Sequence, residues 1–386
     1  MSDSQFTLTP RRKSLRILST SDWHLGNSRV PTQNIIRRLQ TVIFPLLSKT
    51  DILNIGGDVW DTVLTLSNET NGIVSFIIDL LRECSTHNVT VRVLLGTYVH
   101  DRDQSTIFEI CQEKCNFKNN LKYINQLCLE EIKEHDIRIL YLPDDLPYES
   151  SDAVLEAVSE LMSVRGWDWI DYVFGHGYFL HMIPETIPRK PKCLFKISQF
   201  KNIVRRYVCM GHVHMSDFTE NVFYNNSFDR IAHGEELPKG CVYLEDFGTS
   251  AKIKFIENTQ ATKFVTIDLS SYKDKETIGQ YYLEKVEKKF SEGEAGYVRV
   301  IHPSVEIRQA LHRITTNKYP NLIYSFLKFS DDNGIDNHPS LRKSFDVSEY
   351  PTPTKETLPK MIEEFLEKNE GMSLSRIRID KILSDL

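Results

Sequence analysis

The stretch LRILSTSDWHLG, residues 15–26, changes character abruptly halfway along its length. Residues 15–20 are mostly apolar, as in a buried strand, whereas Asp22 and His24 follow at once. Open α/β sheets place their functional sites beyond the carboxyl ends of their strands. The stretch therefore predicts an α/β fold with a polar site at one edge of its sheets.

Six further apolar runs end in polar or glycine-containing turns, which indicates more strands of the same kind. They are DILNI (51–55), VTVRVLL (89–95), IRILYL (137–142), DYVF (171–174), RYVCM (206–210) and CVYLEDF (241–247). Helical patterns separate several runs, among them a stripe of Ile73, Phe76, Ile77, Leu80 and Leu81. A second helix is predicted between Ser151, as its N-cap, and Gly166, as its stop. Strands alternating with helices predict an α/β sandwich with many buried strands over residues 12–250.

The pattern of predicted strands and helices changes near residue 252. Strands are predicted at 264–269, 297–302 and 322–329, with helices at 274–291 and 303–315, which indicates a small α/β domain over 251–335. Residues 336–386 are predicted to hold a linker and C-terminal helices, with one apolar stripe that includes Leu358 and Phe365. About 30 residues cannot bury such a stripe alone. The stripe either packs back onto its own domains or docks onto a partner helix.

The composition excludes some classes of protein. The net charge of −6 argues against a protein that coats nucleic acid, although a local basic surface is compatible with it. No apolar run approaches the ~20 residues that cross a bilayer, and the first residues lack the pattern of a signal peptide. The seven cysteines form no CxxC pair. We expect a reduced, cytoplasmic protein without membrane attachment.

Aspartate and histidine recur just beyond the predicted strands. They are Asp22, His24, Asp58, His100, Asp101, His176, His212 and His214. Each motif alone is common as a plain turn, but their recurrence at five strand ends predicts one shared metal site. Carboxylates and imidazoles without a thiolate suit a site for two divalent ions; manganese is preferred, and iron, magnesium and zinc stay open. Two ions about 3.5–4 Å apart activate water for hydrolysis of a phosphate ester.

The ordered motifs DxH (22–24), GD (57–58), His-Asp (100–101), GH (175–176) and GHxH (211–214) resemble those of calcineurin-type metallophosphoesterases. SDWHLG, GGDVWD and YNNSFDRIAHGEELPKGCVYLED (224–246) resemble more narrowly the SbcD-type DNA exonuclease subunits, some of them phage-encoded. The resemblance implies a metallophosphoesterase β-sandwich flanked by helices, a small α/β capping domain and C-terminal helices. It further implies an SbcC-like ATPase partner, a homodimer through the nuclease core, and a bacterial or phage-infected cell. The candidate dimer surface is the helix near 73–81 with its neighbouring loops.

The resemblance also implies roles, position by position. One ion would be held by Asp22, His24, Asp58 and His214. The other would be held by Asp58, His176, His212 and one more ligand. His100 would protonate the leaving alkoxide or contact the phosphate, with Asp101 orienting its ring.

One departure affects the second ion. In the family the motif is GNHD, and its asparagine is a metal ligand. The corresponding stretch of this chain is GTYVHD, with Val99 before His100. Thr97 could fill the place, or a backbone carbonyl or water, or His100 itself. The departure also leaves room for a catalytically weakened scaffold.

Residues 188–206 carry a basic segment with no acid. We expect DNA backbone contacts from this segment and from the first ligand loop. The candidates are Arg29, Arg189, Lys190, Lys192, Lys196 and Lys201. Phe195 and Phe200 would either stack on bases or belong to the core. The alternative substrate is a small phosphate ester hydrolysed without a partner.

Overall fold

The computed structural model describes residues 14–64, 68–183, 191–272 and 277–326. The chain divides into two units, residues 1–326 and 327–386. The predicted C-terminal helices therefore lie outside the described residues, as do Arg189 and Lys190. The predicted domain boundaries near 250 and 335 stay predictions.

Two six-stranded sheets form the larger part of the described chain. The first sheet has the order β14-β13-β1-β2-β3-β4. Its members are β1 (Leu15–Thr20), β2 (Ile52–Ile55), β3 (Thr90–Leu94), β4 (Leu121–Ile124), β13 (Gly240–Asp246) and β14 (Ala251–Glu257). Strands β1 to β4 are parallel, whereas β13 and β14 add an antiparallel edge.

The second sheet has the order β11-β12-β10-β7-β6-β5. Its members are β5 (Cys128–Ile132), β6 (Ile137–Leu142), β7 (Ile170–His176), β10 (Val204–Gly211), β11 (Phe218–Thr219) and β12 (Val222–Tyr224). Its four central strands, β12, β10, β7 and β6, are parallel. A two-stranded piece of β8 (Tyr178–Phe179) and β9 (Leu194–Phe195) stands apart from it.

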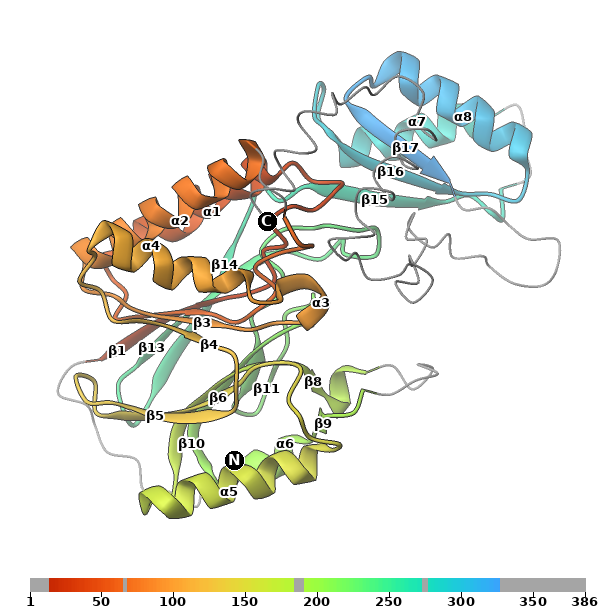
Figure 1. Cartoon of the computed structure of the whole chain (residues 1–386). Helices are drawn as coiled ribbons and strands as arrows, with labels where there is room; N and C mark the ends of the chain where they lie inside the picture. The colour runs from red at the N-terminus through yellow and green to blue at the C-terminus, as the bar shows by residue number, and fades with distance from the viewer. Residues whose placement is uncertain (1–13, 65–67, 184–190, 273–276, 327–386) are drawn as a thin grey trace, which may run out of the picture. The chain divides into compact units, whose positions relative to one another are not determined.

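Helices cover the outer faces of both sheets. Helices α1 (Thr32–Leu47), α2 (Asn68–Thr86) and α4 (Ile107–Cys115) pack on the first sheet, and α5 (Ser151–Arg165) packs on the second (Figure 1). Adjacent residues of one strand serve different cores: Leu18 faces the helices, and Ile17 faces the other sheet. Because both faces of the central strands are buried, those strands are largely apolar. This arrangement confirms the predicted α/β sandwich flanked by helices and is consistent with a metallophosphoesterase-like fold.

A three-stranded parallel sheet follows in the chain, in the order β15-β16-β17. Its strands are β15 (Lys263–Asp268), β16 (Gly296–Ile301) and β17 (Leu322–Phe326), connected by α7 (Ile278–Lys289) and α8 (Val305–Lys318). Both helices pack on one face of this sheet through a separate apolar core (Figure 1). The described residues thus contain the strand and helix order that the sequence predicts here.

Two sequence interpretations need correction. The stripe on α2 is buried in the core, with Phe76 2% exposed, so the stripe itself is not an exposed surface, and a dimer through this helix and its neighbouring loops stays a prediction. The N-cap of α5 is Ser150, one residue earlier than predicted, because its hydroxyl accepts the backbone N–H of Ala153. Gly166 ends that helix as predicted, with a left-handed φ of 65°. None of the described helices is long and apolar enough to cross a membrane.

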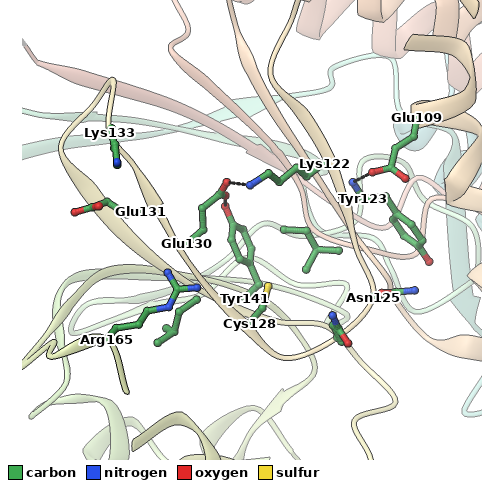
Figure 2. A pocket seen from close by; sticks show the side chains of 13 residues that line it. Glu109, Lys122, Tyr123, Asn125, Cys128, Glu130, Glu131, Lys133, Tyr141 and Arg165 are labelled. Atoms are coloured by element: carbon green, nitrogen blue, oxygen red, sulfur yellow. Dashed lines mark hydrogen bonds and ion pairs between the residues drawn. The ribbon is translucent and has the colours of Figure 1, made fainter. Parts of the chain in front are cut away.

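A buried ion pair joins the two sheets. The guanidinium of Arg92 on β3 donates to the carboxylate of Glu130 on β5 through Nε (2.7 Å) and Nη2 (2.9 Å). Glu130 also accepts hydrogen bonds from Tyr141 and Lys122 beside an open pocket of about 540 Å³ (Figure 2). None of the predicted metal ligands lines this pocket.

Candidate metal centre

The predicted ligands all follow parallel strands of the two sheets. Asp22 and His24 come after β1, Asp58 comes after β2, and His176 ends β7. His212 and His214 come directly after β10. The carboxyl ends of these strands lie at one edge, where the six side chains form two triads.

The first triad consists of Asp22, His24 and His214, whose ligand atoms lie within 4.8 Å of one another. The Nε2 atoms of His24 and His214 are 3.1 Å apart. Nε2 of His214 lies 3.6 Å from Oδ1 of Asp22. Two imidazole nitrogens and one carboxylate oxygen therefore converge on one point.

The second triad consists of Asp58, His176 and His212, again within 4.8 Å. Nε2 of His176 lies 3.3 Å from Oδ2 of Asp58 and 3.0 Å from Nδ1 of His212. Nε2 of His212 is buried and has no hydrogen-bond partner among the described residues.

Hydrogen bonds outside the triads fix the histidine rings. The Nδ1–H of His176 donates to the carbonyl of Gly56 (2.7 Å), and the Nδ1–H of His214 donates to Oε1 of Glu235 (3.0 Å). Nδ1 of His24 lies 3.2 Å from Oδ1 of Asp61. A hydrogen bond at Nδ1 leaves the lone pair of Nε2 for a metal ion. The donor set therefore fits divalent cations.

The electrostatics of the centre favour a cation. Burial alone would raise the pKa of Asp58, but His176 holds it well below its usual value. Burial would lower the pKa of His176, and Asp58 raises it to about 10. Each charged group is thus stabilised by its neighbours, so a bound cation would replace protons that the imidazoles otherwise carry.

The backbone of the ligand loops is strained. Asp22, His24, Asp58 and His212 have φ values of 52°, 49°, 48° and 89°. Few non-glycine residues adopt this left-handed region, and such strain gathers at functional sites. Gly96 lets the loops approach, since a Cβ there would lie 2.0 Å from the backbone nitrogen of Asp58.

The irregular stretch between Gly96 and His100 is a single helical turn, α3 (Tyr98–Asp101). The prediction that Asp101 orients the His100 ring is wrong. Its carboxylate accepts the backbone N–H groups of Gly96 (2.7 Å), Asp58 (3.0 Å) and Trp60 (3.0 Å). The Nδ1–H of His100 donates instead to the carbonyl of Asp61 (2.7 Å). Burial and the Asp58 carboxylate raise the pKa of Asp101 to about 7.

His100 itself lies beside the first triad rather than the second. Its ring centroid is 5.2 Å from that of His24. One potential ligand atom from each of His24, Asp61 and His100 lies within 4.8 Å of the other two. Thr97 lies at the second triad: its Oγ1 is 3.2 Å from both Oδ2 of Asp58 and Nδ1 of His212. Of the three alternatives for the missing asparagine, Thr97 is the side chain nearest to that place.

Two functional candidates escaped the sequence reasoning, Asp61 and Glu235. Both lie in stretches that carry the family resemblance, GGDVWD and HGEE. Neither follows a strand directly, and only the folded loops bring them to the Nδ1 atoms of His24 and His214.

The predicted DNA-binding residues are only partly free. Lys192 pairs with Glu149 (3.0 Å) and Lys201 pairs with Glu220 (2.9 Å), all on the surface, whereas Lys196 is exposed. Arg29 donates to the carbonyl of Ile231 (3.2 Å).

The suggestion that Phe195 and Phe200 stack on bases is wrong. They are 3% and 0% exposed and belong to the core beneath the second sheet.

Comparison with known proteins identifies no family. No family model matches the chain, and no curated protein matches it. Many solved structures are similar over part of the chain, including the following two. One is described as GAP50, the anchor in the inner membrane complex of Plasmodium (14% identity, TM-score 0.39, 66% of this chain and 88% of that chain). The other is TT1561 of Thermus thermophilus (8% identity, TM-score 0.37, 63% of this chain and 99% of that chain).

Proposed function

We propose that this chain is a metal-dependent phosphodiesterase, and more narrowly a manganese-dependent DNA nuclease subunit of the SbcD type. The observation that carries the proposal is the convergence of six ligands from separate loops into two neighbouring triads. Asp22, His24 and His214 would hold one ion. Asp58, His176 and His212 would hold the other. Two such ions supply an activated water and neutralise charge on the phosphoryl oxygens.

A side chain of the protein would protonate the leaving group. The Nδ1–H of His100 donates to the Asp61 carbonyl, which leaves Nε2 to carry a proton. A protonated Nε2 can pass that proton to the departing alkoxide oxygen. We therefore propose His100 as the general acid, with the carbonyl of Asp61 orienting its ring.

Two arginines support a polyanionic substrate. Burial and the nearby Arg29 guanidinium lower the pKa of Arg299 on β16. The tyrosine hydroxyl of Tyr297, two residues before Arg299, donates to the carbonyl of Arg29. The carbonyl of Ile231 accepts from Arg29, and the amide of Ile231 donates to Glu235 (3.3 Å), so this arginine contacts the loop that holds His214. Paired guanidinium groups at such a place suit backbone phosphates.

A second candidate, a phosphodiesterase of small esters, is favoured by a different observation. A pocket of about 240 Å³ adjoins His176 and is lined by Asp144, Tyr178 and Lys192, among others. This volume is slightly below that of typical small-molecule sites, about 300–1,000 Å³, so it would suit a small ester. The ion pairs of Lys192 and Lys201 also reduce the free basic surface expected for DNA.

One experiment separates these functions. The full chain is incubated with Mn²⁺ and either linear duplex DNA or bis(p-nitrophenyl) phosphate, beside the Asp58→Asn variant. Degradation of DNA that needs Asp58 supports the nuclease, and hydrolysis of the small ester alone supports the second candidate. Inertness on both substrates, with manganese bound and with an SbcC-like ATPase added, would mean a weakened scaffold and overturn the proposal.

A further inference from the structure

A buried glutamate–lysine pair lies behind the first triad and belongs to no ligand set. Oε1 of Glu235 accepts the Nδ1–H of His214 (3.0 Å). Its second oxygen, Oε2, lies 3.2 Å from the ammonium of Lys239 and 3.3 Å from the amide of Ile231. Three donors thus fix one carboxylate that is only 14% exposed.

The side chain of Lys239 is fully buried, and three oxygens surround its ammonium. The ammonium donates to the carbonyl of His214 (2.7 Å) and to Oδ1 of Asn226 (3.2 Å), and it forms an ion pair with Oε2 of Glu235 (3.2 Å). A buried charge is costly unless it is paired and hydrogen-bonded in this way. The lysine therefore holds both the backbone of His214 and the carboxylate that orients its ring.

The two nitrogens of His214 face opposite partners. Nδ1 faces Glu235, whereas Nε2 faces the first triad, 3.1 Å from Nε2 of His24. Glu235 is thus placed behind the ring and not among the three ligand atoms of that triad. A carboxylate behind a histidine ligand fixes its tautomer and makes Nε2 a stronger donor.

We propose that Glu235 and Lys239 are positioning residues that set the affinity of the first triad for its divalent ion. The inference rests on the proposed function only in taking the two triads as metal sites. Loss of such a carboxylate typically lowers metal affinity about 10- to 100-fold. The effect should be confined to one of the two ions, because no contact of Glu235 reaches Asp58, His176 or His212 among the described residues.

The test is a titration of the metal-free full chain with Mn²⁺. Binding is measured by calorimetry and by the electron paramagnetic resonance signal of free Mn²⁺. Glu235→Ala should bind one ion as the wild type does and the other about 10- to 100-fold more weakly. Excess Mn²⁺ should then restore hydrolysis toward the wild-type rate.

Glu294→Ala is the matched control, since Glu294 also accepts from a lysine, Lys263 (2.8 Å), and from a backbone amide, Ser291 (2.9 Å), but contacts no histidine among the described residues. It should leave the affinity for both ions unchanged.

Lys239→Met is a second variant, for use if Glu235→Ala does not fold. It should also weaken the binding of one ion only. Wild-type affinity for both ions in a folded variant at Glu235 would overturn the inference and leave the proposed function intact. A wild-type chain that binds no Mn²⁺ would overturn both.

Discussion

At the scale of single residues, Thr97 is the side chain found at the second triad, where the family resemblance leads us to expect an asparagine. Its hydroxyl lies 3.2 Å from Oδ2 of Asp58 and from Nδ1 of His212. An amide oxygen is a better ligand for a divalent ion than a neutral hydroxyl, because its lone pairs are more basic. The second ion of this chain should therefore be the weaker one.

Thr97→Asn should accordingly raise the affinity for the second ion on the order of tenfold. It should also raise the rate of hydrolysis at limiting Mn²⁺. Thr97→Val, of nearly the same volume, should weaken the ion by a similar factor. Metal titration of both variants checks the prediction. Equal affinities in both variants would mean that another group completes the second site.

His100 gives a second prediction at this scale. His100→Ala should lower kcat about 100- to 10,000-fold, which is the usual contribution of a general acid. The fold should persist, since His100 is only partly buried and its ring makes a single hydrogen bond, to a carbonyl, among the described residues. The number of Mn²⁺ ions bound per chain, measured beside kcat, distinguishes the roles. Loss of one ion would make His100 a ligand, a reading compatible with its place beside His24 and Asp61.

Site residues could be predicted from the sequence only where they come just after a predicted strand. All six predicted ligands of the triads do so. Asp61 and Glu235 do not, since their roles arise from loops that meet only in the folded chain. The role predicted for Asp101 is wrong because its neighbour in sequence, His100, is not the group its carboxylate contacts.

At the scale of secondary structure, burial and length together determined which strands the sequence revealed. The seven apolar runs all correspond to strands of the two sheets. Strands β4, β5, β11, β12 and β14 were missed. Four of them lie at the edge of a sheet, whereas β12 is buried but has only three residues, Val222–Tyr224. Edge strands face solvent and carry charges, as in AKIKFIE, so they do not read as apolar runs.

The edge strand β5 carries an interaction whose pH dependence can be measured. Burial alone would raise the pKa of Glu130, but the hydrogen bond and charge of Arg92 lower it to about 2. A lowered pKa in the folded state means that the pair stabilises the fold above the ordinary value near 4.5. That stabilisation is lost as the pH falls from there through about 2.

Glu130→Gln should therefore destabilise the protein by about 3–5 kcal/mol at pH 7, because the side chain of Arg92 is 0% exposed and would keep an unpaired charge. The difference from the wild type should shrink between pH 5 and pH 2, as followed by urea denaturation. Glu131→Gln, on the exposed side of the same strand, is the control and should change stability little at any pH. A difference that stays constant with pH would show that packing, not charge, holds the strand.

At the scale of the whole molecule, the two triads are complete within residues 14–326. The apolar stripe predicted for the tail, with Leu358 and Phe365, lies outside the described residues. Hydrolysis and partner binding should therefore be separable by truncation. Deleting residues 356–386 should leave hydrolysis of bis(p-nitrophenyl) phosphate within about twofold of the full chain, since no triad residue is removed.

We propose that the predicted stripe docks onto the coiled coil of an SbcC-like ATPase, so the same deletion should abolish binding to that partner. Co-elution of the two proteins in size-exclusion chromatography measures it. Leu358→Asp with Phe365→Asp in the full chain is the sharper variant, since it keeps the length of the tail and removes only its apolar character. If this double variant still co-elutes but loses thermal stability, the stripe packs onto its own chain, and the partner would have to dock elsewhere.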